Sequence, residues 1–436
     1  MGERQAPSQA PSAVQTLSGE AHAASLQDAL QDALAATLSP SSPRIYNERL
    51  ILSLLRRHGP LSKIEVARHT GLSAQTAAAL MNRLSADGLI GRLDPLRGRV
   101  GQPAVPFALA PEGAFSAGLK IGRRSCDLVL VDFTGTLRWR AHKTFSWPMP
   151  ATLLAFVAEA LPRAIASLSP RQRLRMTGLG IATPFELWNW GDEIGAPKGA
   201  MDVWRDFDIL SEVSALCACP VTLCNDATAA CAGEMFFGQG WRHRDIAYFF
   251  VGSFIGGGIA LNGALYSGHT GNAGALGSMP VCGVQGNRAD TQQLIRRASI
   301  YLLEHRLIAA GIDPSSIWRT PDVWDDFGPH LDAWLEEAGN ALALASLAAI
   351  SVIDFDAIVV DGAVPPAVRS ALVAQVTLAL SRLDRQGLSP VRVLEGTIGS
   401  DARAIGGAAL PLLASFGHDR EALLRTGAAS LNTLDA

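Results

Sequence analysis

The chain has 436 residues, of which 48% are hydrophobic and 18% charged, and its formal net charge is −3. This length exceeds the ~250–300 residues at which a single hydrophobic core stops growing, so we expect at least two domains. The composition excludes a wholly disordered chain, and six cysteines are too few for a disulfide scaffold. No secretory signal opens the sequence, so we expect a cytoplasmic protein.

The most apolar stretch, residues 246–287, has no Asp, Glu, Lys or Arg but contains eleven glycines. A transmembrane helix needs about 20 consecutive apolar residues. Because glycines interrupt the stretch throughout, we expect a glycine-rich sheet with tight turns and no association with a membrane.

The charge is unevenly distributed along the chain. Residues 44–110 hold ten Lys or Arg against four Asp or Glu, a local charge of +6 in an otherwise acidic chain. Residues 1–43 have no aromatic side chain and are rich in Ala, Ser, Gln and Pro, which predicts a disordered tail. We therefore expect this tail, a small basic module at 44–110 and a large acidic body at 111–436. The basic module suggests binding to nucleic acid.

Three helices are predicted in the basic module. The first covers about 44–57, the second 62–69 and the third 73–87, and the last two begin at the N-cap residues Ser62 and Ser73. A short helix, a tight turn containing glycine and a second capped helix form the helix-turn-helix pattern.

Two short strand patterns follow, at 89–92 and 105–109, and predict a two-stranded wing around an arginine-rich loop. In such a module the last helix enters the major groove. The residues expected to contact DNA are Ser73, Gln75 and Thr76 on that helix, with Arg83, Arg97, Arg99 and Gln102 around it. The alternative is a protein-interaction module whose polar face is solvated.

Beyond residue 111, predicted strands alternate with predicted helices. The expected strands are 114–121, 127–133, 176–181, 221–224, 246–251, 257–261, 357–361 and 391–395. The expected helices are 152–167, 226–234, 331–349, 367–385 and one that begins at 401. This alternation predicts an α/β body with mixed sheets.

Several motifs of the body occur in a characteristic order. They are 178–184 (Gly-Leu-Gly-Ile-Ala-Thr-Pro), Trp204, 225–230 (Asn-Asp-Ala-Thr-Ala-Ala), 256–268, 271–277, and 399–407 with Asp401. In this order, behind a winged helix-turn-helix, they resemble the ROK family of bacterial sugar kinases and repressors. The resemblance implies a two-lobed, actin-like sugar-kinase body. It also implies a repressor of carbohydrate-related genes that binds a double-stranded DNA operator as a homodimer or higher homo-oligomer.

The resemblance further assigns roles around a crevice between the two lobes. Asp226 stands where the family has its catalytic base, and Asn225 matches a ligand of a sugar hydroxyl. With His269 of the glycine-rich loop, these are the expected effector-binding residues. Asp226 could instead be a helix N-cap, and His269 could simply be solvated.

Other family elements are altered. The first-hairpin motif, acidic and then Gly-Gly-Thr in the family, reads Lys-Ile-Gly-Arg-Arg at 120–124. Phe254 replaces a glycine of the second phosphate loop, and Asp361 replaces the first glycine of a pair on the adenosine side. We therefore expect no catalytic residues, and a regulator that responds to a sugar or polyol. The alternatives are an ATP-dependent sugar kinase with a DNA-binding appendage, and a regulator controlled by a partner protein.

The zinc ligands of the family are also absent. The family's Gly-Glu-Ile-Gly-His reads Gly-Ala-Leu-Gly-Ser at 274–278, and Cys282 alone remains of three closely spaced cysteines. One thiolate cannot form a four-ligand site, so we expect no metal and no cofactor. Cys217, Cys219 and Cys224 have apolar neighbours and no nearby His, and are expected to be buried core thiols.

Overall fold

The computed structural model describes residues 43–95, 105–191, 195–285, 288–319 and 323–417. The predicted tail and the tip of the predicted wing lie outside these ranges. None of the described helices combines the length and the apolar composition needed to cross a lipid bilayer.

The basic module consists of three helices and a small antiparallel sheet. The helices are α2 (Pro43–His58), α3 (Lys63–Thr70) and α4 (Ala74–Ala86). Ser62 caps α3 and forms a capping box with Glu65, and Ser73 caps α4, as predicted. The wing has three strands where two were predicted, because β1 (Leu61–Ser62) pairs with β3 (Pro106–Leu109), which also pairs with β2 (Ile90–Arg92).

The first lobe of the body is built on a five-stranded sheet in the order β6-β5-β4-β7-β8. Its strands are β4 (Phe115–Ile121), β5 (Ser125–Asp132), β6 (Leu137–Thr144), β7 (Met176–Thr183) and β8 (Val221–Asn225). β6 was not predicted, because its side chains are mostly exposed and polar. The helices of this lobe are α5 (Pro150–Ala166), α6 (Pro170–Arg173) and α7 (Ile209–Ala215).

The second lobe contains a sheet in the order β11-β10-β9-β14-β15 and a separate hairpin, β12-β13. The strands are β9 (Ile246–Val251), β10 (Gly256–Leu261), β11 (Ala264–Tyr266), β12 (Pro280–Gln285), β13 (Arg288–Gln293), β14 (Ala357–Gly362) and β15 (Arg392–Glu395). The helices are α9 (Ile295–Ala298), α10 (Ile300–Ala309), α11 (Ser316–Arg319), α12 (Gly328–Ile350) and α13 (Pro366–Ser381).

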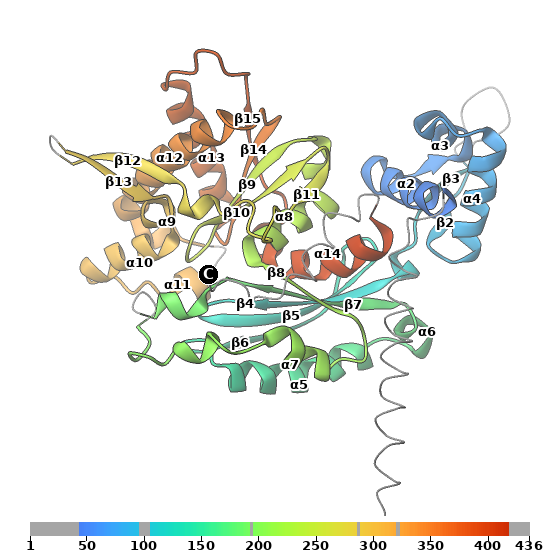
Figure 1. Cartoon of the computed structure of the whole chain (residues 1–436), viewed down its shortest axis with the longest axis horizontal. Coiled ribbons are helices and arrows are strands. Elements are labelled where there is room, and N and C mark those ends of the chain that lie inside the picture. The colour runs from blue at the N-terminus through green and yellow to red at the C-terminus, as the bar shows by residue number, and fades with distance from the viewer. Residues whose placement is uncertain (1–42, 96–104, 192–194, 286–287, 320–322, 418–436) are drawn as a thin grey trace, which may run out of the picture. The chain divides into compact units, whose positions relative to one another are not determined.

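Two helices, α8 (Asp226–Phe236) and α14 (Ala402–Phe416), lie between the two sheets, and α5 covers the outer face of the first sheet (Figure 1). Glycines allow α14 to approach its neighbours closely. A Cβ atom on Gly118 of β4 would collide with the carbonyl oxygen of Ala404, and one on Gly406 would collide with that of Ala229 on α8. The predicted mixed α/β class is therefore confirmed, with α14 at the centre of the body.

The prediction that Cys217 and Cys219 are buried core thiols is wrong. Both residues are half-buried, and a disulfide joins them. The turn between α7 and β8 brings their Cα atoms to 5.3 Å, which is within the range that a disulfide spans. Cys224 is a free thiol, and burial raises its pKa to about 12.

Candidate functional site

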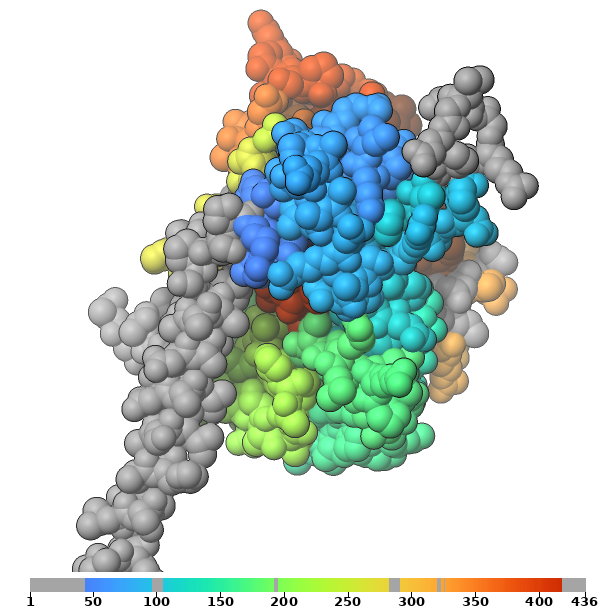
Figure 2. Space-filling view, turned by 90° about the vertical axis from the view of Figure 1, so that its right-hand side faces the viewer, coloured from blue at the N-terminus to red at the C-terminus, as the bar shows by residue number. Residues whose placement is uncertain are grey.

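The first candidate surface is the N-terminal half of α4. Ala77, Leu80, Met81 and Leu84 are buried, as predicted from their spacing, so the opposite face of the helix is exposed. Ser73, Gln75 and Thr76 are all exposed. The helices of the module form the blue surface that faces the viewer in Figure 2.

Two of these three side chains also stabilise the helix start. The Ser73 hydroxyl accepts a hydrogen bond from the Thr76 amide at 3.1 Å, and the two hydroxyl groups are 2.8 Å apart. The Gln75 side chain takes no part in this cap. Ser73 and Thr76 thus have a local role, whereas Gln75 is exposed and has no part in the cap.

Two cationic side chains lie on or beside α4 within the described residues. Arg83 is exposed and lies 3.8 Å from Asp87 in an i,i+4 ion pair. Lys63 on α3 donates to the Asn82 side chain on α4 at 2.6 Å and adds a positive charge beside the helix-turn-helix. Arg97, Arg99 and Gln102 of the predicted wing lie outside the described residues.

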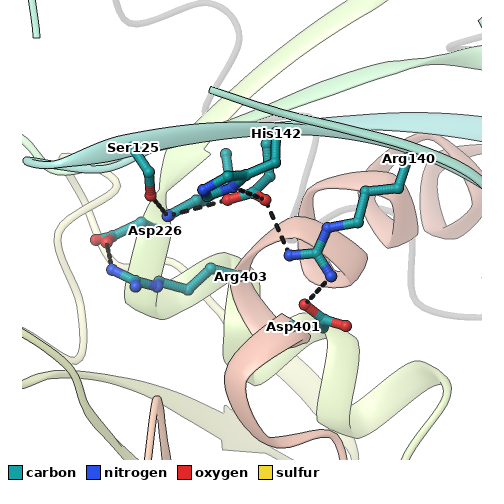
Figure 3. A network of polar contacts seen from close by, with 8 residues as sticks. Ser125, Arg140, His142, Asp226, Asp401 and Arg403 are labelled. Carbon is teal, nitrogen blue, oxygen red and sulfur yellow. Dashed lines mark hydrogen bonds and ion pairs between the residues drawn. The ribbon is translucent and has the colours of Figure 1, made fainter. Parts of the chain in front are cut away.

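The second candidate site is a polar network in the body (Figure 3). Lys120 on β4 and Asp127 on β5 are opposite each other in the antiparallel register, and Lys120 Nζ lies 3.2 Å from Asp127 Oδ2. Lys120 also donates to the Ser125 hydroxyl at 2.9 Å. On β6, Arg140 and His142 both contact Asp127 Oδ1, at 2.9 and 2.7 Å.

Asp127 is the acidic centre of this network. Its side chain is 6% exposed. Burial alone would raise the pKa of the Asp127 carboxyl, but the Lys120 ammonium and hydrogen bonds from His142 and Arg140 hold that pKa well below its ordinary range. Burial lowers the pKa of Lys120, and the neighbouring charge of Arg403 lowers it further. Asp127 therefore remains ionised and neutralises the buried cation.

Two ion pairs extend the network to α14. Arg403 Nη1 lies 3.1 Å from Asp226 Oδ2, and Arg140 Nη1 lies 2.9 Å from Asp401 Oδ1 (Figure 3). Asp401 and Arg403 belong to the segment that starts α14, whereas Asp226 starts α8. The network thus connects three strands of the first sheet to the N-terminal ends of both central helices.

The predicted effector residues Asn225 and Asp226 lie side by side, but their roles differ from the simplest expectation. Asn225 is the N-cap of α8, since its side-chain oxygen accepts from the amides of Ala227 and Thr228 at 3.0 and 3.4 Å. Asp226 is the first residue inside the helix and is buried. Its two oxygens accept from the Ala227 amide and from Arg403, so Asp226 is not the cap.

His269, the third predicted effector residue, is exposed in the loop that follows β11. Among the described residues, no hydrogen bond or ion pair joins it to Asn225 or Asp226. The structure therefore brings together two of the three predicted residues.

The residues that the resemblance places at the phosphate elements also form direct contacts. The Arg123 guanidinium lies 3.5 Å from the centre of the Phe254 ring and 4.6 Å from that of Trp190. This stack joins the β4-β5 turn to the β9-β10 loop. Asp361, at the end of β14, accepts from Tyr248, from the Gly399 amide and from Arg369, at 3.0, 3.1 and 3.2 Å.

Sequence reasoning missed Arg403, Arg140 and His142. Arg403 is 177 positions from Asp226, and no local pattern connects such distant residues. Its place two residues after Asp401, in a recognised motif, was the one available signal. Arg140 and His142 lie at alternate positions of β6, and alternate residues of a strand point to the same face. A prediction of this strand from the sequence would therefore have placed them together.

No group of three His, Cys, Asp or Glu side chains that could hold a metal ion occurs in the described part of the chain. The side chain of Cys282 is outside that part.

Comparison with known proteins identifies relatives of both parts. Residues 116–293 match the model of the ROK family, and residues 46–90 match the model of the winged helix-turn-helix DNA-binding proteins. Over 235 residues the chain is 25% identical to the xylose repressor of Bacillus spizizenii. The match covers 54% of this chain and 60% of the repressor, so the chain spans less than two thirds of that relative.

Two solved structures share the fold. A ROK family transcriptional regulator, described as a homologue of the E. coli MLC protein, matches with a TM-score of 0.59 and 18% identity, covering 88% of this chain and 98% of the other. A ROK family glucokinase from Streptomyces griseus, solved with glucose and AMPPNP, matches with a TM-score of 0.50 and 21% identity, covering 68% and 99%. Regulators and kinases therefore share this architecture.

The buried pair predicts a strong effect of Asp127→Asn. The substitution leaves Lys120 buried without its main counterion, which should lower the free energy of unfolding by about 3–5 kcal/mol in urea denaturation. Asp202→Asn is the control, because its ion pair with Arg205 is exposed and should contribute about 0–1 kcal/mol. Equal losses in both variants would contradict the central role of Asp127.

The same pair predicts a dependence of stability on pH. The folded pKa of Asp127 is depressed, so its contribution to stability is complete at neutral pH. The contribution begins to fall as the pH approaches the ordinary carboxyl pKa of about 3.9, and it is lost entirely once the pH is below the folded value. Unfolding free energies measured from pH 7 to pH 3 should therefore fall more steeply for the unmodified chain than for Asp127→Asn.

Proposed function

Because the chain carries a ROK family domain behind a winged helix-turn-helix module, we propose that it is a sequence-specific transcriptional regulator, a repressor of carbohydrate-related genes that responds to a sugar or polyol. The observation that carries the proposal is this order of the two matched parts, joined to the exposed, capped helix α4. The module 44–110 is the proposed DNA-binding domain, and 111–436 the proposed effector domain. The proposed setting is the cytoplasm, with a homodimer or higher homo-oligomer on two half-sites of an operator.

The charge and the helix geometry support DNA as the partner. The +6 charge of the module favours the displacement of phosphate counterions. Gln75 is the proposed base-reading residue, because a glutamine side chain can form paired hydrogen bonds with adenine in the major groove. Ser73 and Thr76 would hold the helix start at the groove, and Arg83, Arg97, Arg99 and Gln102 would contact the backbone or the minor groove.

The body is proposed to sense a ligand without catalysing phosphate transfer. A sugar kinase needs a carboxylate base, a metal-organising acid and open phosphate loops. Here Lys120 stands in place of the acid, and Arg403 occupies one oxygen of Asp226. Arg123 stacks on Phe254 at the two phosphate elements, and these contacts all favour a regulator.

Asn225, Asp226 and His269 remain the proposed effector-binding residues. Vicinal hydroxyls of a sugar or polyol can donate to the Asp226 carboxylate and accept from a cation beside it. Arg403 supplies such a cation at 3.1 Å from Asp226. A ligand bound there would therefore compete with an existing ion pair, which predicts a modest affinity.

The DNA proposal predicts different effects of two neighbouring substitutions. The test uses a duplex recovered by in vitro selection on the full chain. Gln75→Ala should lower the affinity for that duplex and reduce the ratio of this affinity to the affinity for unrelated DNA. Ser73→Ala removes a helix cap that contributes about 1 kcal/mol, and it should lower the affinity for DNA of every sequence to the same extent. Fluorescence anisotropy measures both, and no binding by the full chain at low salt would contradict DNA recognition.

Arginines of the wing provide a second comparison on the same duplex. Replacing Arg97 or Arg99 with Ala should lower the affinity for DNA of every sequence. It should also reduce the slope of log affinity against log salt concentration by about one for each lost phosphate contact. A change of sequence preference without a change of slope would instead assign these residues to base reading.

The effector proposal predicts that Asp226→Asn weakens sugar binding. A hydrogen bond to a charged group contributes about 1.5–3 kcal/mol, so the affinity for the best ligand should fall about tenfold or more in calorimetry. Sugars, sugar phosphates and polyols form the panel, and the exposed Asp384→Asn is the control. Equal affinity in Asp226→Asn would place the ligand elsewhere.

An ATP-consumption assay over the same sugar panel separates the regulator from the kinase. The regulator predicts no sugar-dependent turnover. Turnover that depends on a sugar, and disappears in Asp226→Asn, would establish the kinase.

A further inference from the structure

Arg56, on the last turn of α2, lies among aromatic residues of the body. Its guanidinium carbon is 3.8 Å from the centre of the Phe236 ring, 4.9 Å from that of Phe133 and 5.5 Å from that of Phe237. Its Nη1 donates to the Phe133 carbonyl at 2.9 Å. Burial lowers the pKa of Arg56 to about 9, although Asp132 opposes this shift. We call Phe133, Phe236 and Phe237 the aromatic seat of Arg56.

The seat and the polar network are built on the same elements. Strand β5 carries Asp127 in the network and ends directly before Phe133. Helix α8 begins at Asp226 and ends at Phe236, with Phe237 as its C-cap. Each element therefore has one end in the network and the other in the seat.

Helix α14 forms a third connection. Arg403 lies in its first turn, and Phe416 at its end contacts the Phe133 ring at 4.8 Å between ring centres. The 11 residues of α8 span about 16 Å at a rise of ~1.5 Å per residue, so the seat is roughly one short helix away from Asp226.

The packing between these elements leaves little room for one to slide past another. Gly406 of α14 meets the backbone of Ala229 on α8, and Gly118 of β4 meets the backbone of α14. Closely packed interiors transmit strain, because their side chains have few voids to move into. A displacement of α8, α14 or β5 at the network should therefore produce a displacement of similar size at the seat.

The module side of the seat is less tightly filled. A hollow of about 240 Å³ beside Arg56 is lined by Leu55 and Leu109 of the module and by Phe236 and Phe237 of the body. The same region contains a hydrophobic cluster with Ile51 and Leu55 of α2, Met81 and Leu84 of α4, and Phe133, Phe236 and Ala408 of the body. A shift of Arg56 would thus move Ile51 and Leu55 of α2, which belong to the same hydrophobic cluster as Met81 and Leu84 of α4.

We propose that Arg56 is a positioning residue that couples the polar network of the body to the winged module, through its contacts with Phe133, Phe236 and Phe237. This inference rests on the proposed function, since it gives the module a signal from the effector domain. Arg56 would then act on DNA binding by orienting α2 and α4, without itself needing to contact DNA.

Hydrogen exchange on the full chain, without DNA or ligand, tests this coupling separately from DNA binding. Arg403→Gln breaks the ion pair with Asp226, and we expect it to speed exchange of the α2 and α4 amides by at least about fivefold, the low end of ordinary coupling between sites. In the Arg56→Met background, where apolar volume is kept, the same substitution should change that exchange less than about twofold. Equal effects in the two backgrounds would overturn the proposal.

Three controls keep the outcome specific. The exchange of the β14 amides reports any global loss of stability, and this change is subtracted from the change measured for the α2 and α4 amides. Arg175→Gln removes another link, since Arg175 donates to the Asp87 and Gly113 carbonyls at 3.0 Å each without reaching the seat. The effect of Arg403→Gln should survive in that background, and its loss there would overturn the special role of Arg56. If Arg56→Met unfolds the module, Arg56→Lys replaces it and should retain only part of the coupling.

Discussion

The close approach of α14 to its neighbours is the constraint on which the polar network and the aromatic seat of Arg56 depend. Gly118, Gly180 and Gly406 allow backbone to meet backbone where any side chain would intervene. As a result α14 presents Asp401 and Arg403 to the network at one end and Phe416 to Phe133 at the other. A helix held further away by a single methyl group would make none of these contacts at their present distances.

Within this frame, the polar network is built around a buried cation. The position that the ROK resemblance expects to be acidic carries the Lys120 ammonium. That cation is covalently attached and already neutralised by Asp127 at 3.2 Å. The network is therefore held together by its own side chains, and its carboxylates do not depend on a bound ion for neutralisation.

The sequence predicted those parts of the structure whose signals are local. Ser62, Ser73 and the spacing of Ala77, Leu80, Met81 and Leu84 were sufficient to place α3 and α4, because caps and helical periodicity act over a few residues. The Asn225-Asp226 pair was found through a recognised motif. Its partner Arg403 was not found, because the pairing depends on how α14 packs.

Three further residues show the same limit. Arg56 has the appearance of a phosphate contact, since it lies in a basic helix of a basic module, and only the tertiary structure places it on Phe236. Cys217 and Cys219 have apolar neighbours in sequence, yet the turn before β8 leaves them half-buried and paired.

The distribution of exposure in the network indicates which of its contacts can change. Lys120 and Asp127 have side chains that are 11% and 6% exposed, whereas Arg140 and His142 on β6 are 40% and 45% exposed. Moving the inner pair would leave a buried charge without its partner, which is costly. The outer pair can exchange its contacts with Asp127 and Asp401 for contacts with water or a ligand at much lower cost. The outer contacts can therefore rearrange while the inner ion pair, and with it the first sheet, stays in place.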